Sequence, residues 1–185
     1  MQIKGSAVRT ILDFVKTKFP EKLDEWLSRL PSSVSSIYKG SIRPSDWYPL
    51  HDAAIIPTEI LSEIAFNGDI KKASRECGRF SAESSLRGIY RFFLMATPSR
   101  MVVSTGGRIL ATFYNPVDFK LVESGSEGAK IHITRIEDTN GVIENRIAGW
   151  IERALEIQGL KASQVDITQS LTKGDPVTEI TIVWK

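Results

Sequence analysis

Apolar residues in the first part of the chain recur with the period of an α-helix. One set at helical spacing comprises Val8, Ile11, Leu12, Val15 and Phe19. A second set comprises Leu23, Trp26, Leu27 and Leu30. Pro20 is suited to the first position of the second helix, and Pro31 ends it. We therefore predict two amphipathic helices that each bury one face in a core.

Residues 31–49 are rich in Ser and Pro and are predicted to form a loop. The loop ends in Trp47 and Tyr48, which either anchor it in the core or face a partner or ligand as a lid. A short helix is predicted over residues 57–66, and Asp69 is a suitable N-cap for the helix that follows.

That next helix is long, over residues 70–94, and it carries a stripe of small side chains. Its members recur every three or four positions and are Ala73, Cys77, Ser81, Ser84 (or Ser85) and Gly88. Either another helix packs closely on this stripe, or the stripe forms one wall of a ligand cavity, with Phe80 beside it.

After residue 98 the pattern changes to alternation typical of strands. Three hairpins are predicted, pairing residues 101–103 with 109–113, 117–122 with 130–136, and 165–171 with 177–184. A helix over residues 142–158, capped by Gly159, is broadly apolar on one face. Because helices and strands are segregated, we predict one α+β domain over residues 1–185. N-terminal helices would pack on an antiparallel sheet built from C-terminal hairpins, with the late helix lying on the sheet.

Composition excludes several classes of protein. The chain is 42% hydrophobic and carries a net charge of +2, as ordinary soluble domains do. Basic residues between 71 and 91 are interrupted by Glu76 and Glu83, so we predict no nucleic-acid binding. Cys77 is the only cysteine, which excludes an intramolecular disulfide, and it is expected to be buried. No signal peptide or membrane-spanning run is recognised, and the expected location is cytoplasmic.

Groups able to support catalysis are sparse. The only histidines are His51, which is followed by Asp52, and His132, which alternates with isoleucines and should face solvent. His51 with Asp52 suggests a general base, but no nucleophile motif stands near them. No set of Cys, His and carboxylates has the spacing of a metal site. The chain is therefore predicted not to be an enzyme.

Several segments together resemble the transport-protein-particle (TRAPP) components and the 4-vinyl-reductase-type domains. The segments are Gly78-Arg79, residues 115–123, Gly149-Trp150, residues 154–156 and residues 174–180. Lys4-Gly5 and the helix ending at Phe19 are similar to the opening of heme-nitric-oxide-binding domains, which share that general fold. The resemblance implies helices packed over an antiparallel sheet, and a protein that holds a small apolar or acyl ligand or assembles with like subunits.

Departures from these groups limit the cofactors that we expect. Phe80 follows Gly78-Arg79 at the position where the TRAPP-type proteins have an acylated cysteine. The last hairpin lacks the cysteine pair that the 4-vinyl-reductase-type domains often carry near their end. No histidine lies in residues 80–98, and the Tyr-x-Ser-x-Arg motif of the heme-binding domains is missing. We therefore expect neither heme nor metal.

The favoured function is a non-catalytic module, with a sensory role left open, that binds an apolar or acyl ligand in a cavity beside the central helix. Its predicted ligand-binding residues are Trp47, Tyr48, Ala73, Cys77, Phe80, Ser81, Ser84 and Gly88. The alternative is an assembly scaffold without ligand, acting as a homodimer or with a protein partner.

Overall fold

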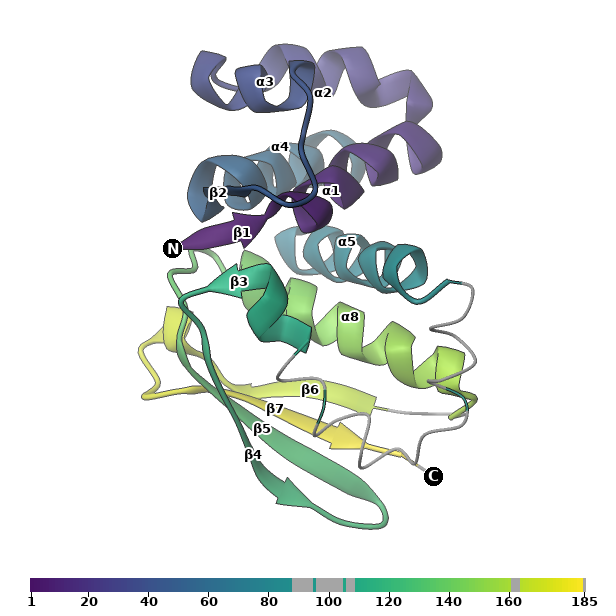
Figure 1. Ribbon diagram of the computed structural model, residues 1–185, viewed down its shortest axis with the longest axis vertical. Helices are drawn as coiled ribbons and strands as arrows, with labels where there is room; N and C mark the ends of the chain where they lie inside the picture. The colour runs from purple at the N-terminus through teal and green to yellow at the C-terminus, as the bar shows by residue number, and fades with distance from the viewer. Residues whose placement is uncertain (88–94, 96–104, 106–108, 161–163, 185) are drawn as a thin grey trace.

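The computed structural model describes residues 1–87, 95, 105, 109–160 and 164–184. It confirms the predicted α+β class. The N-terminal helices stack in layers above α8 (Val142–Gln158), and α8 in turn covers one face of a four-stranded sheet (Figure 1).

The predicted helices of the N-terminal layers are confirmed. Their bounds are α1 Gly5–Lys18, α2 Leu23–Arg29, α4 Ile56–Ala65 and α5 Ile70–Ser85, with a 3-10 turn at Pro20–Lys22 and a π-helical turn at His51–Ile55. Asp69 caps α5 as predicted, because its side chain accepts a hydrogen bond from the amide of Lys72 at 2.9 Å. The helix ends at Ser85, before the predicted end at residue 94; residues 88–94 lie outside the described residues.

The prediction of a loop over residues 31–49 is wrong. The segment contains the helix α3 (Ser32–Lys39) and the strand β2 (Trp47–Pro49). Val34 and Tyr38, four residues apart, are both buried, and the Tyr38 ring lies edge-on to Trp26 with centroids 4.9 Å apart. Two anchors one turn apart outweigh the weak helix preference of the serines between them.

The strand predicted over residues 109–113 is also wrong, since these residues are helical. Ile109, Leu110 and Phe113 occupy one side of this turn, and Leu110 is buried. Their spacing of three and four residues is typical of a helix, although their β-branched and aromatic residue types are typical of a strand. The predicted partner strand, residues 101–103, lies outside the described residues.

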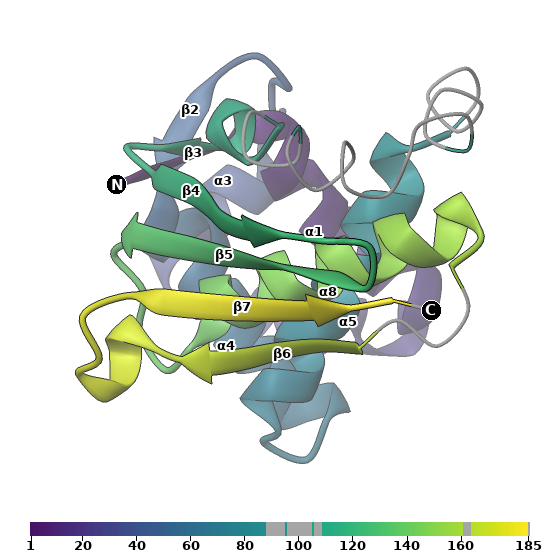
Figure 2. The same ribbon diagram turned by 90° about the horizontal axis from the view of Figure 1, so that it is seen from below.

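Two antiparallel sheets follow. A small sheet has the order β2-β1-β3, with β1 at Gln2–Lys4 and β3 at Tyr114–Asn115. The larger sheet has the order β4-β5-β7-β6 and contains the two other predicted hairpins (Figure 2). Its strands are β4 Asp118–Ser124, β5 Gly128–Arg135, β6 Gln164–Gln169 and β7 Thr178–Val183. Ile131, Ile133, Ile180 and Ile182 face α8 and are buried.

Helix α8 has the predicted bounds and joins the two halves of the molecule. Gly159 ends it in the left-handed conformation with φ +98°, as a C-cap glycine does. On its other side α8 crosses α5 at very short range. A Cβ added to Gly78 would lie 2.0 Å from the carbonyl oxygen of Arg146, and one added to Gly149 would lie 2.2 Å from that of Arg75. Only glycine allows the two backbones to approach this closely.

Candidate functional site

The predicted small stripe lies in the interior of the protein. Ala73, Cys77 and Ser81 are buried, whereas Phe80 and Ser84 are half-buried. Gly88 lies outside the described residues. The contact between Gly78 and the backbone of α8 shows that helix packing occupies the position next to Cys77. Whether a ligand could lie beside Cys77 therefore depends on the other side chains around it.

Trp47 and Tyr48 are held by their own neighbourhood, away from the stripe. Both lie on β2, which pairs with β1. The ammonium group of Lys4 lies 4.4 Å from the centre of the Trp47 ring, and the Tyr48 hydroxyl accepts a hydrogen bond from the amide of Arg43 at 3.0 Å. Both side chains are half-buried. These contacts anchor the end of the predicted loop.

Phe80 lines a surface hollow of about 270 Å³ together with Phe14, whose ring centre lies 5.3 Å away. The other lining residues are charged and come from α1, α5 and α8: Lys18, Glu76, Arg79, Glu83 and Arg153. The hollow thus has a small aromatic floor and a charged rim.

A polar group that the sequence analysis missed lies in the core beside Cys77. Arg146 is only 2% exposed. Its Nη2 donates hydrogen bonds to the carbonyl oxygen of Ala7 at 2.8 Å and to the hydroxyl of Thr10 at 3.0 Å. Its Nη1 is buried and has no hydrogen-bond partner within the part of the chain that the structure describes. The sequence did carry a signal, because Arg146 stands three residues after Ile143 and four before Trp150, on a face predicted to be apolar.

Three neutral side chains surround this guanidinium, and Arg146 acts electrostatically on each of them: Tyr38, Cys77 and Tyr114. Burial raises the pKa of Cys77 to about 12, while the charge of Arg146 opposes that rise. Burial also raises the pKa of Tyr38 and that of Tyr114, again opposed by Arg146. All three stay protonated at neutral pH, so none supplies a counter-charge. We call Tyr38, Cys77, Tyr114 and Arg146 the buried cluster.

Carboxylates near the start of α8 have other partners. Glu144 is buried and accepts hydrogen bonds from the hydroxyls of Ser170 and Thr178. Asp138 accepts hydrogen bonds from the amides of Ile143 and Glu144 at 2.8 and 3.0 Å, and no described residue forms a hydrogen bond with its second oxygen, Oδ1. Burial raises the pKa of Asp138 to about 6, although these amide hydrogen bonds lower it. Among the described residues, no carboxylate forms an ion pair with Arg146.

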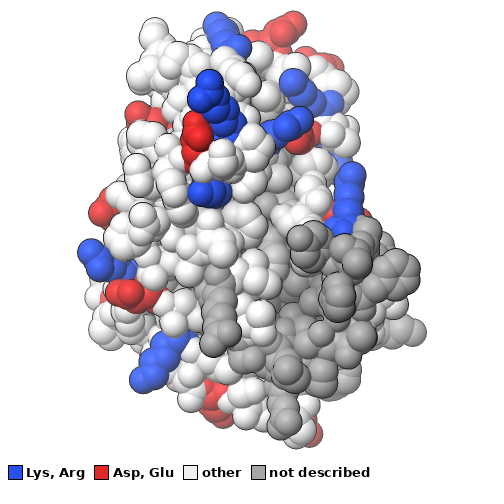
Figure 3. All heavy atoms as spheres, viewed as in Figure 1, with Lys and Arg blue, Asp and Glu red and all other residues white. Residues whose placement is uncertain are grey.

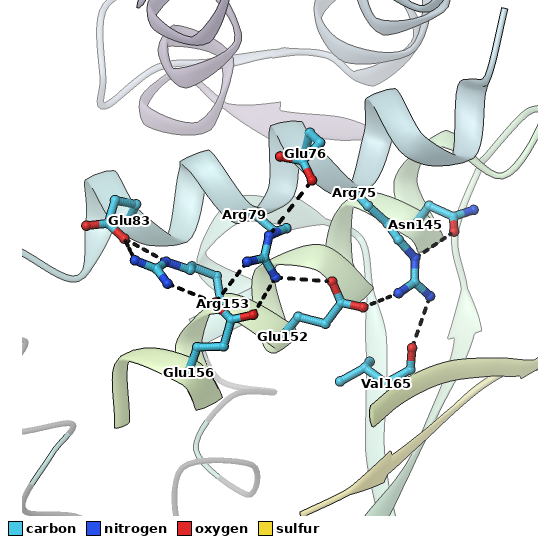
Figure 4. A network of polar contacts seen from close by, with 9 residues as sticks. All are labelled: Arg75, Glu76, Arg79, Glu83, Asn145, Glu152, Arg153, Glu156 and Val165. Carbon is cyan, nitrogen blue, oxygen red and sulfur yellow. Dashed lines mark hydrogen bonds and ion pairs between the residues drawn. The ribbon is translucent and has the colours of Figure 1, made fainter. Parts of the chain in front are cut away.

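The outer edge of the α5–α8 contact is, in contrast, a network of ion pairs (Figure 4). Arg79 makes two hydrogen bonds of 2.8 Å to the carboxylate of Glu156, which also accepts one from Arg153. Arg75 pairs with Glu152 and donates to the carbonyl oxygen of Val165 at 3.0 Å. The network connects α5, α8 and the edge strand β6. On the face drawn in Figure 3, basic and acidic side chains are interspersed and do not gather by sign.

Both histidines lie outside the core. His51 is exposed, and its Nδ1 lies 3.2 Å from the carboxylate of Asp52, so the two adjacent side chains do meet. His132 lies on the sheet face opposite α8, with its Nε2 2.8 Å from the carboxylate of Glu179. No cluster of metal-binding side chains occurs among the described residues. Within the same part of the chain, no helix is both long and apolar enough to cross a bilayer.

Solved structures share this arrangement over nearly the whole chain. The H-NOX protein of K. algicida in its Fe(II) unliganded state is 12% identical, with a TM-score of 0.72, over 99% of this chain and 97% of that one. The H-NOX protein of S. oneidensis in the Fe(II)NO ligation state is 12% identical, with a TM-score of 0.66, over 99% of both chains. A mutant of T. tengcongensis H-NOX is 15% identical, with a TM-score of 0.62, over 99% of this chain and 98% of that one.

The chain has the H-NOX fold. This finding confirms the expectation that the fold is shared with the heme-nitric-oxide-binding domains. At these identities the likeness shows the fold alone. No protein-family model and no curated protein matches the chain, so the resemblance to the TRAPP and 4-vinyl-reductase groups stays a prediction.

Among the described residues, neither of the two histidines nor Cys77 is placed to ligate a heme iron in the core. Protein ligands to heme iron are chiefly histidine, cysteine thiolate, methionine or tyrosine. His51 and His132 point away from the core, and each already has a carboxylate partner. Burial keeps the Cys77 thiol protonated, whereas the thiolate is the form that binds metal. The tyrosines of the buried cluster are likewise held in the neutral form.

Proposed function

We propose that the protein is a non-catalytic, sensory binding module that holds a small apolar or acyl ligand beside α5 and works without heme. The observation that carries the proposal is the buried cluster, in which Nη1 of the buried Arg146 has no hydrogen-bond partner among the described residues. The fold supports it, since the S. oneidensis H-NOX protein has this shape in a ligated state, Fe(II)NO.

Ligand binding at this place would be non-covalent. Acylation of a cysteine requires the thiolate, and burial disfavours that form at Cys77. The predicted residues Ala73 and Ser81 lie on the same side of α5 as Cys77 and would contact the apolar part of the ligand. Removal of that part from water contributes about 25 cal/mol per Å² of apolar surface.

Catalysis has little support in the described residues. The His51–Asp52 pair is exposed and does not line the hollow at Phe80. A general base must lie within hydrogen-bond reach of a bound substrate. If His51→Ala abolished a measurable turnover, the non-catalytic part of the proposal would fail.

Native mass spectrometry of protein purified directly from expressing cells tests the ligand. We expect a population heavier than the bare chain, and organic extraction should release the extra mass as an apolar molecule. A bare chain from several expression hosts, together with no uptake of added fatty acid or fatty alcohol, would contradict the proposal.

Hemin titration tests independence from heme. We expect the absorption spectrum to remain that of free hemin, with the same result for the His51→Ala/His132→Ala double variant. A heme spectrum typical of axial ligation that survived in the double variant would identify an axial ligand other than histidine and overturn this part of the proposal.

The alternative function of a scaffold remains compatible with ligand binding. Large apolar side chains that are clearly exposed among the described residues are Met95, Val122 and Val183, and they come from separate segments. Such scattered positions give no extended apolar face of the kind that stable dimers bury. Light scattering over a range of concentrations would test the predicted homodimer.

A further inference from the structure

Arg146 is a buried cation whose charge the described residues leave uncompensated. The two acceptors on its Nη2, the Ala7 carbonyl and the Thr10 hydroxyl, are neutral. Nη1 lacks a hydrogen-bond partner. Arginine stays protonated in proteins and cannot escape the problem by losing its charge. Removing such an ion from water has an effective cost of several kcal/mol, which is why buried charges are normally paired.

The neutral groups on which the charge of Arg146 acts do not supply the missing anion. Tyr38 comes from α3, Cys77 from α5 and Tyr114 from β3, and all three are neutral. The Tyr38 hydroxyl is already used, because it donates to the carbonyl oxygen of Ala53 at 2.7 Å.

The nearby carboxylates do not form an ion pair with Arg146 among the described residues. Glu144 is satisfied by hydroxyl groups of the loop that joins β6 to β7 and of β7 itself. Asp138 influences Tyr114 but makes no ion pair with Arg146, and its Oδ2 caps the start of α8. Arg146 in the core thus lacks the carboxylate partners that Arg79 has on the surface.

We propose that Arg146 binds the carboxylate of an apolar monocarboxylic acid, of which a fatty acid is the simplest example. A guanidinium presents parallel N–H groups that match a carboxylate, and such pairs are strong where water is excluded. The surrounding core is apolar, so the rest of the ligand should be apolar too. This inference rests on the proposed function and specifies its ligand class.

Isothermal titration calorimetry on delipidated protein separates the head group from the chain. The probes are decanoate and decan-1-ol, which share a chain length and differ in charge. We expect decanoate to bind the wild-type protein at least about tenfold more tightly than decan-1-ol near neutral pH. Arg146→Met should abolish this preference while both probes still bind. Arg29→Met, which removes an exposed arginine of α2, is the matched control and should keep it.

A buried substitution can prevent folding, so Arg146→Lys is the second variant. It keeps the charge without the paired N–H groups and should retain a reduced preference for decanoate. Each variant must unfold cooperatively in a thermal melt before it is titrated.

The possible outcomes are distinguishable. Equal affinity of the wild-type protein for both probes would overturn the head-group assignment and leave the proposed function standing. A preference that persists in Arg146→Met would also overturn it, because the carboxylate would then bind elsewhere. Stabilisation by inorganic phosphate or acetate as large as that by decanoate would indicate a site for small anions instead. If neither probe binds and native mass spectrometry finds no ligand, the proposed function itself fails.

Discussion

Helix α8 presents charged side chains in two contrasting settings. Along its outer edge, Arg153 and the arginines of α5 meet carboxylates, and the guanidinium of Arg79 is paired on two of its nitrogens. At its inner end, Arg146 and, just before the helix begins, Asp138 each keep a buried polar atom without a hydrogen-bond partner among the described residues. The outer edge is half-exposed and satisfied, whereas the inner end is buried and incomplete. The outer charges thus hold the helices together, whereas the inner ones keep unpaired atoms, and Arg146 is the one that we propose to bind a ligand.

Both settings depend on the close crossing of α5 and α8, which a single methyl group should break. In Gly78→Ala, the new Cβ would lie 2.0 Å from the carbonyl oxygen of Arg146 and 2.9 Å from the amide of Trp150, both backbone atoms. We expect the free energy of unfolding to fall by about 3 kcal/mol despite the better helix propensity of alanine. Chemical denaturation measures it.

Gly125→Ala is the control for this substitution, because a Cβ at that position has no neighbour within 4 Å. It should change stability by less than about 0.5 kcal/mol. A Gly78→Ala variant as stable as the wild-type protein would show that the two helices can separate without cost.

Asp138→Asn should show how much the buried, incompletely paired carboxylate of Asp138 lowers the free energy of unfolding. The folded protein raises the pKa of this carboxyl to about 6, chiefly through burial. Protonation therefore favours the folded state. That stabilisation is fully present below the unfolded pKa and is lost as the pH rises through about 6. Asn has no charge and keeps an oxygen for the amides of α8, so we expect it to be more stable by on the order of 2 kcal/mol above about pH 7.

The pH dependence distinguishes this effect from a gain in stability that is independent of pH. The difference between Asp138→Asn and the wild-type protein should vanish below about pH 3, where Asp138 is protonated in both states. Asp13→Asn, at an exposed position of α1, should show little change at either pH. If Asp138→Asn were less stable than the wild-type protein at every pH, the hydrogen bonds from the α8 amides to the carboxylate would stabilise the protein by more than burial of the carboxylate destabilises it.

Much of the fold could be predicted from apolar spacing because each element has its own periodic pattern. The bounds of α8 follow from its broad apolar face and from Gly159, and the inward face of β7 follows from simple alternation. Prediction failed where local composition and burial disagree. The serines of α3 are typical of a loop, yet Val34 and Tyr38 fasten that segment to the core.

The candidate site was harder to predict because it is assembled from distant segments. Cys77 stood out as the only cysteine, and Arg146 is an exception in an apolar stripe. Nothing in their local sequence indicates that Tyr38, Tyr114 and Thr10 meet them. That meeting depends on how α1, α3, α5 and β3 are packed around α8, which no single periodic pattern records.

The smallest expected effect belongs to the satisfied outer edge. A double-mutant cycle with Arg79→Gln and Glu156→Gln isolates the energy of their paired hydrogen bonds. Burial would raise the pKa of Glu156, but hydrogen bonds from Arg79 and Arg153 outweigh it and leave that pKa below its usual value. Because the pair is partly exposed, we expect a coupling energy of only about 0.5–1 kcal/mol.

Salt should weaken this coupling, since mobile ions screen exposed charges. The Lys130–Glu123 pair, 3.5 Å apart and more exposed, provides the control and should couple more weakly still. A coupling energy of several kcal/mol that does not change with salt would mean that the outer pairs behave as buried ones do. The outer edge and the inner end of α8 would then differ only in the number of hydrogen-bond partners and no longer in exposure to water.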